Sequence, residues 1–165
     1  MVDTESKVGV QENRVFLCVI DDTQEMHKAL RFACRRSLRK NGRVALLYVV
    51  EPADFQHWMS VEKLMREEAM ERANERLREV SQEALALTGN EPITYIREGT
   101  RSEELVKLVE EERDISILVL GAGTDKEGPG PLVSNFINKM SIGQFRIPVT
   151  IVPGSLKDED IDAIT

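Results

Sequence analysis

Apolar residues gather in short runs along the chain, and segments with helical spacing separate these runs. Four of the runs are mostly continuous, and a fifth, at residues 93–97, alternates between apolar and polar positions. Continuous apolar runs of this kind are typical of strands that are buried on both faces of a sheet. We therefore predict strands at residues 15–20, 44–50, 93–97, 115–120 and 148–152.

Between these strands, apolar positions recur every three or four residues, which is the spacing of a helix with one buried face. Helices are predicted after residue 22, from about 58 to 87, after residue 100 and at 132–144. The first has its apolar stripe at Met26, Ala29, Leu30, Ala33, Cys34 and Leu38. The stripe of the second consists of Val61, Met65, Ala69, Ala73, Leu77, Val80, Ala84 and Leu87. Asp22 with Glu25, and Thr100 with Glu103, have the spacing of capping boxes that would begin the first and third helices.

The regular alternation of strands and helices predicts how the chain folds. Strands that are joined through helices form right-handed crossovers, which place the strands parallel to one another and the helices on the faces of the sheet. The predicted fold class is α/β, with a five-stranded parallel sheet and helices on both faces. We expect one domain at residues 14–153, a mobile N-terminal arm at 1–13 and an acidic C-terminal tail at 154–165.

Length and charge exclude several classes of function. The chain has 165 residues, and its 29 acidic and 22 basic side chains give a net charge of −7. This length suits one domain, and the acidic excess opposes general binding to nucleic acid or to anionic lipid. The sequence shows neither an apolar run long enough for a membrane helix nor a secretion signal, so we expect a cytoplasmic protein. Cys18 and Cys34 are expected to be buried, reduced thiols.

A glycine-rich stretch follows the predicted strand at residues 115–120. In an open parallel sheet, ligands bind beyond the carboxyl ends of the strands, where the strand order reverses. A glycine loop between a strand and a helix can hold a phosphate through backbone N–H groups, but the same residues also suit a long flexible turn. Two stricter nucleotide motifs are absent. No glycine is followed by Lys and Ser or Thr, and Lys126 stands where the dinucleotide fingerprint needs its third glycine.

Five segments, taken together and in this order, resemble the universal stress protein family. They are Val19-Ile20-Asp21, Tyr48-Val49-Val50, Arg97-Glu98-Gly99, Ile117-Leu118-Val119-Leu120-Gly121 and Pro148-Val149-Thr150-Ile151-Val152-Pro153. The resemblance covers roughly residues 14–153. It implies a five-stranded α/β sandwich, and it leaves the ligand open because members of the family divide into those that bind ATP and those that do not.

The nucleotide-binding pattern of this family is only partly present. It consists of a glycine that ends the fourth strand, two residues, a second glycine, nine residues, and Gly followed by Ser or Thr. Gly121 matches the first glycine, Thr124 stands at the second, and Ser134 with Asn135 replaces the final pair. Thr124 adds a branched side chain where glycine allows close approach, although its hydroxyl can itself donate to phosphate. Ser134 adds only a small group, and Asn135 can still donate an N–H.

Three further residues complete the predicted site. The resemblance assigns Asp21 to contacts with ribose and adenine and Val49 to the lining of the adenine, while Lys126 would add a positive charge near phosphate. We therefore expect either an altered site for ATP, AMP or a related adenine nucleotide, or no nucleotide at all. For an acidic chain, phosphate binding would have to come from backbone N–H groups and Lys126.

The sequence leaves three readings of the function. The first is a stress-response binding and regulatory module that holds an adenine nucleotide. The second is a member without nucleotide that acts through protein contacts, with the glycine-rich loop and the His57-Trp58 region as contact surfaces. The third is slow ATP hydrolysis, for which the chain shows no base and no metal ligand set beyond Asp21. No catalytic residue and no metal site are predicted, since His27 and His57 lie apart.

We also expect a homodimer. The last predicted strand, between Val149 and Val152, would lie at an edge of the sheet, where its unpaired backbone groups can bind another strand. In the resembling family this strand commonly pairs with its own copy across a twofold axis.

Overall fold

The computed structural model describes residues 14–52, 59–138 and 145–165. Its strands are β1 (Val15–Val19), β2 (Arg43–Val50), β3 (Ile93–Glu98), β4 (Ile115–Ala122) and β5 (Val149–Pro153). They form one sheet in the order β3-β2-β1-β4-β5, and every neighbouring pair is parallel. This arrangement confirms the predicted fold class.

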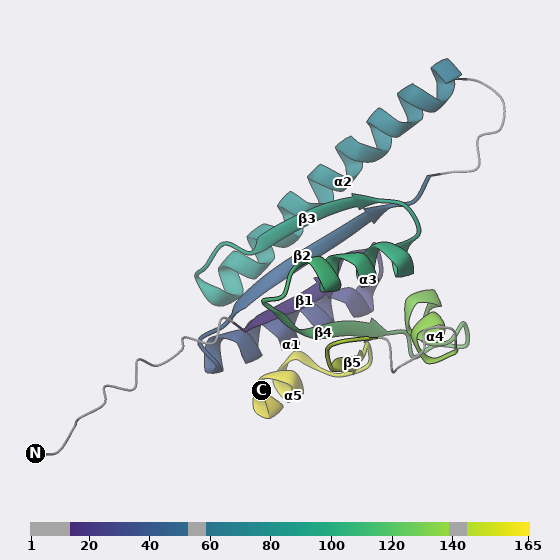
Figure 1. Ribbon diagram of the computed structural model, residues 1–165. Coiled ribbons are helices and arrows are strands. Elements are labelled where there is room, and N and C mark those ends of the chain that lie inside the picture. Colours follow the sequence, from purple (N-terminus) through teal and green to yellow (C-terminus); the bar gives the residue numbers. More distant parts are fainter. Residues whose placement is uncertain (1–13, 53–58, 139–144) are drawn as a thin grey trace, which may run out of the picture.

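Helices cover both faces of the sheet (Figure 1). They are α1 (Gln24–Arg39), α2 (Met59–Thr88), α3 (Arg101–Glu111), α4 (Pro131–Asn138) and α5 (Asp158–Ile164). The sheet separates two hydrophobic cores. Leu17 of β1 packs in the core under α3 and α4, whereas its neighbours Phe16 and Cys18 pack in the core under α1 and α2. Successive residues of β1 thus face opposite layers, so every residue of this strand is buried.

Only the C-terminal half of α2 packs against the sheet as the predicted stripe requires. Ala73, Leu77, Val80 and Ala84 are buried, but Val61 is 48% exposed. Figure 1 shows the reason, since the first turns of α2 extend beyond the ends of the strands. Leu38, which was predicted on the stripe of α1, is also an exception, with 45% of its surface exposed.

The predicted capping boxes do not form. The N-cap residue of α1 is Thr23 rather than Asp22, and it makes no side-chain cap bond. Asp22 lies instead 3.5 Å from the Nε of Arg76. The N-cap of α3 is Thr100, as predicted, but its side chain also forms no cap bond. The predicted helix at 132–144 is found as α4, and residues 139–144 lie outside the described part of the chain.

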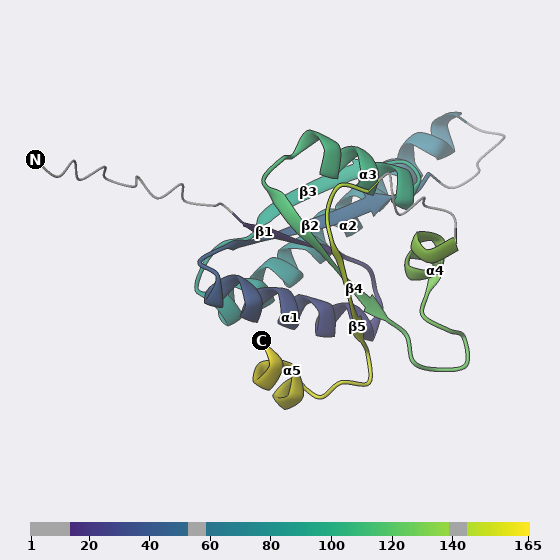
Figure 2. The same ribbon diagram turned by 60° about the horizontal axis from the view of Figure 1, so that its bottom comes forward.

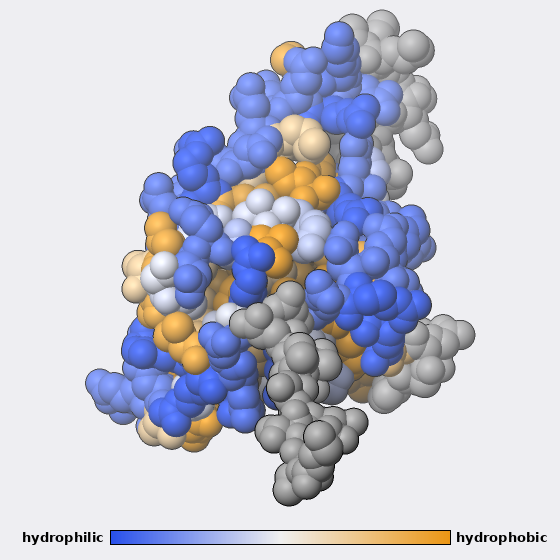
Figure 3. All heavy atoms as spheres, turned by 60° about the vertical axis from the view of Figure 1, so that its left-hand side comes forward, coloured by the Kyte–Doolittle hydropathy of each residue, from blue (hydrophilic) through white to orange (hydrophobic). Residues whose placement is uncertain are grey.

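Hydrophilic residues predominate on the face shown in Figure 3, with smaller hydrophobic areas between them. None of the helices in the described part of the chain is long and apolar enough to cross a lipid bilayer. Cys18 and Cys34 are free and buried, as expected. Burial raises the pKa of the Cys18 thiol well above its ordinary value and that of Cys34 to about 12, so both thiols stay protonated and unreactive.

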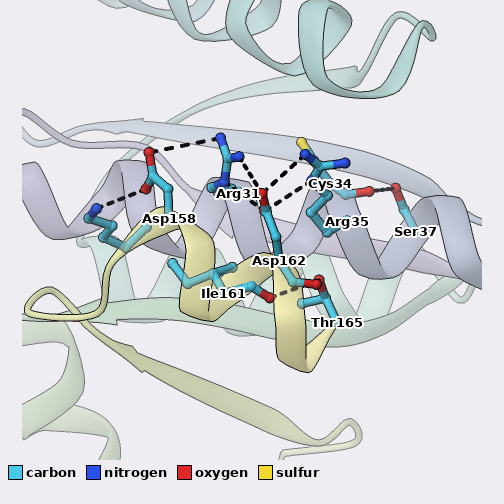
Figure 4. Close-up of polar contacts among 9 residues, drawn as sticks. Arg31, Cys34, Arg35, Ser37, Asp158, Ile161, Asp162 and Thr165 are labelled. Atoms are coloured by element: carbon cyan, nitrogen blue, oxygen red, sulfur yellow. Dashed lines mark hydrogen bonds and ion pairs between the residues drawn. The ribbon is translucent and has the colours of Figure 1, made fainter.

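The C-terminal segment was predicted as an acidic tail after a domain that ends at residue 153, but helix α5 folds it onto the domain. Helix α5 packs beside α1, and Ile161 is fully buried between them (Figures 2 and 4). Asp162 accepts hydrogen bonds from Arg31 at 2.8 and 2.6 Å and from Arg35 at 3.1 and 3.2 Å. Asp158 accepts one from Lys28 at 2.8 Å.

These ion pairs keep both carboxylates charged. Hydrogen bonding from Arg31 holds the pKa of Asp162 below its ordinary value, and hydrogen bonding from Lys28 does the same for Asp158. Solvent screens these partly exposed pairs, but Arg31 and Arg35 each contact Asp162 with two hydrogen bonds, so this network contributes more than an isolated surface pair. The burial of Ile161 adds to the network in holding α5 in place, since full burial of an Ile side chain stabilises by about 1.5–3 kcal/mol.

The docking of α5 can be tested with two isoleucines of the same helix. We expect Ile161→Ala to lower the free energy of unfolding in urea by about 2 kcal/mol, because it leaves a cavity between α5 and α1. Ile164 is 63% exposed, and Ile164→Ala should change the free energy by no more than about 0.5 kcal/mol. Equal effects of the two variants would show that α5 is not docked.

Candidate functional site

A small pocket lies where the strand order reverses. From β1 the chain continues to β2 on one side, and from β4 it continues to β5 on the other. The pocket at the carboxyl ends of β1 and β4 is lined by residues of both strands, the start of α1, the first residue of α3, the loop before α4 and the start of α4. They are Val19, Asp21, Thr23, Glu25, Met26, Arg101, Leu120, Gly121, Pro129, Gly130, Pro131, Leu132 and Val133.

The pocket is small. Its volume is about 40 Å³, whereas pockets for drug-sized ligands and cofactors measure roughly 300–1,000 Å³. Leu132 and Val133, at the start of α4, close one side because they pack into the core under α3 and α4. A nucleotide can therefore enter only if the segment that begins α4 moves outward.

Asp21 lies at this pocket, just beyond the carboxyl end of β1. Its Oδ1 accepts a hydrogen bond from the backbone N–H of Thr23 at 2.9 Å and a second one from the hydroxyl of Thr23 at 2.6 Å. The carboxylate thus holds the turn that begins α1. Val49 is only 3% exposed, packs in the core under α3 and α4 and does not line the pocket.

The backbone of Asp21 is anchored from α2. Arg76 donates from Nη2 and Nε to the carbonyl oxygen of Asp21, at 3.1 and 3.3 Å. The same guanidinium lies 3.2 Å from a carboxylate oxygen of Glu79. The end of β1 is therefore fixed to the neighbouring helix, a connection that the sequence does not reveal because 55 residues separate Arg76 from Asp21.

Gly121 and Gly123 are required by packing. A Cβ atom on Gly121 would overlap the carbonyl oxygen of Glu25, so the first turn of α1 rests directly on the end of β4. A Cβ atom on Gly123 would lie 2.6 Å from the carbonyl oxygen of Gly128, across the loop. Both contacts are too close for any residue other than glycine.

The loop uses its own N–H groups. Gly123 donates to the carbonyl oxygen of Pro129 at 3.3 Å, and Gly128 donates to that of Asp125 at 3.2 Å. The N–H of Glu127 donates to Oδ1 of Asp125 at 2.9 Å. These donors are therefore not available to a phosphate, although the sequence analysis expected loop N–H groups to hold one.

The other predicted site residues lie around the pocket rather than in it. Thr124 and Lys126 are exposed in the loop, and Ser134 and Asn135 are half-buried on α4. None of these four lines the pocket. The His57-Trp58 region lies outside the described residues. Within residues 14–52, 59–138 and 145–165, no group of three or more His, Cys, Asp or Glu side chains could hold a metal ion.

Two charged residues that the sequence analysis did not assign to the site lie at the pocket. Arg101 is the first residue of α3, and its Nε is buried without a hydrogen-bond partner. A buried donor without an acceptor costs about 1–3 kcal/mol. Glu25 stands in the first turn of α1, with its Oε1 only 3.2 Å from where a Cβ of Gly123 would lie. The only signal for Arg101 was its place just after the carboxyl end of a strand.

Comparisons with known proteins agree with this fold. UspA, a universal stress protein from Lactobacillus plantarum, matches with a TM-score of 0.68 and 16% identity, over 85% of this chain and 97% of its own. An Arabidopsis thaliana family protein with AMP bound matches with a TM-score of 0.59 and 14% identity, over 85% and 91%. A universal stress protein from Archaeoglobus fulgidus, solved in complex with dAMP, matches with a TM-score of 0.57 and 18% identity, over 84% and 95%.

No curated protein matches the chain. The model of the universal stress protein family, by contrast, matches residues 12–153, which include all five strands. This match extends over far more than half of the chain and ends before α5. The chain therefore belongs to the universal stress protein family.

Proposed function

We propose that the chain is a regulatory binding module that takes an adenine nucleotide at the pocket between β1 and β4. The observation that carries this proposal is the meeting of Asp21, Arg101 and Gly121 at the point where the strand order reverses. An open parallel sheet binds its ligands at this place. The relatives described with AMP and with dAMP, which share the fold, support an adenine nucleotide as the ligand.

Binding requires the segment before α4 to move. Gly128 and Gly130 have φ values of +89° and +97°, and a Cβ on either would meet no atom within 4 Å. These two glycines flank Pro129 in open space, so changes in their dihedral angles would shift Pro131 and Leu132 without clashes in the loop. In this proposal the nucleotide displaces Leu132 from the pocket and takes its place beside Asp21.

A second candidate is a member without nucleotide that acts through contacts with other proteins. The specific observation in its favour is that packing alone accounts for Gly121 and Gly123, while several N–H groups of the loop bond within the loop. The two candidates differ in one measurable respect, which is the affinity for nucleotides.

Calorimetric titration decides between them. We expect one adenine nucleotide to bind per chain, and Asp21→Asn to weaken binding about ten-fold, because a charged acceptor for the ribose hydroxyls is lost. Asp114 lies at the opposite, amino end of β4, and Asp114→Asn should leave the affinity unchanged. If AMP, ADP and ATP all fail to bind at millimolar concentration, the nucleotide proposal is wrong and the second candidate stands.

The module is proposed to act as a homodimer through β5. This strand pairs with β4 on one side and forms an edge of the sheet, where Figure 2 shows it. Ile151 is 40% exposed on it, which leaves an apolar side chain beside unpaired backbone groups. Edges of this kind bind a further strand, and a second copy of β5 would supply one.

Sedimentation velocity tests the dimer. The chain should sediment as a dimer at micromolar concentration, and Ile151→Lys should make it a monomer because a lysine on an edge strand opposes pairing. Ile137 is 59% exposed on α4, and Ile137→Lys should remain a dimer. A monomeric wild type, or a dimer that survives Ile151→Lys, would contradict pairing through β5.

A further inference from the structure

The guanidinium of Arg101, unlike those of several other arginines, forms no ion pair with a described carboxylate, although its backbone N–H donates to Oε1 of Glu51 at 3.2 Å. Arg31 is paired with Asp162, Arg66 with Glu98 and Arg97 with Glu111, at distances of 2.6 to 2.8 Å. No described carboxylate forms such a pair with Arg101, and its Nε is buried with no acceptor. A guanidinium that faces a pocket in this way is suited to bind phosphate oxygens, since its N–H groups match them in charge and in geometry.

Glu25 has the opposite effect at the glycine-rich loop. Its Oε1 lies close to Gly123, in the loop that follows β4. The N–H groups of Gly123, Glu127 and Gly128 already have acceptors within the loop. Phosphates placed here would meet a negative charge and would find these donors taken, so each further phosphate is disfavoured.

The charges that line the pocket also disfavour a long phosphate chain. They are the carboxylates of Asp21 and Glu25 and the guanidinium of Arg101, and Lys126 is exposed in the loop and does not line the pocket. A terminal phosphate group carries about −1.5 to −2 charges at pH 7, so the single guanidinium offsets only part of the charge of one phosphate. A second or third phosphate would add negative charge beside two carboxylates with no further cation among the lining residues.

We propose that the pocket selects nucleotides with a single phosphate, that Arg101 binds this phosphate, and that Glu25 excludes longer phosphate chains. The inference rests on the proposed nucleotide-binding function and adds the class of nucleotide and the residues that select it. Adenosine carries no phosphate, so its binding depends on the pocket but not on Arg101. Adenosine binding therefore tests the proposed function separately from the selection of the phosphate.

The test compares adenosine, AMP and ATP by calorimetry, with and without Mg²⁺. Wild-type protein should bind AMP at least about ten-fold more tightly than ATP. Arg101→Gln should weaken AMP binding about ten-fold and leave adenosine binding unchanged. Arg101→Lys keeps the charge and should weaken AMP binding by a smaller factor. Glu25→Gln should bring the affinity for ATP close to that for AMP. Thermal melting of each variant confirms that it is folded.

Matched control variants remove the same charges elsewhere. Arg113 is 69% exposed just beyond the other end of α3, and Arg113→Gln should have no effect. Glu91 is exposed before the amino end of β3, and Glu91→Gln should not improve ATP binding. If ATP binds as tightly as AMP, or if Arg101→Gln binds AMP as tightly as the wild type does, the inference is wrong. The proposed function still stands in that case if adenosine binds. If adenosine and both nucleotides fail to bind, both are wrong.

Discussion

The contact between the first turn of α1 and the end of β4 determines the shape of the candidate site. Gly121 has no side chain, so the backbone of Glu25 rests directly on the strand. This contact places the Cβ of Glu25 2.9 Å from where a Cβ of Gly154 would lie, just after β5, and brings its carboxylate over Gly123. One glycine thus joins α1, β4, the end of β5 and the glycine-rich loop, and it leaves only a small pocket beside Asp21.

Much of the fold could be predicted because its signals are local. The run around Leu17 is buried on both faces, and the alternation with helices indicated a parallel sheet. Helix α5 was missed because, among its seven residues, Ile161 is the only fully buried one and three others are Asp. Its partner Arg31 lies 131 residues earlier than Asp162 in the chain. The exposure of Val61 was not predictable from periodicity, because it depends on where the strands end.

The site, like the fold, could be predicted from the sequence only in part. The resemblance to the family assigned Asp21 to the site, and the loop after β4 was recognised from its glycines, but the sequence suggested a ligand as the reason for them. The structure gives a packing reason for Gly121 and Gly123. Arg101 belongs to no motif, and what distinguishes it is the lack of an acceptor for its Nε, which depends on side chains from several elements. The positive charge of the pocket thus comes from α3, whereas the sequence indicated Lys126.

The most direct test of this account is the stability of Gly121→Ala without any nucleotide. Because an added methyl group would overlap the carbonyl oxygen of Glu25, the free energy of unfolding in urea should fall by about 1–3 kcal/mol or more. A variant that unfolds with the stability of the wild type and has lost only its affinity for nucleotide would contradict the account, since Gly121 would then serve a ligand and not the packing of α1 on β4.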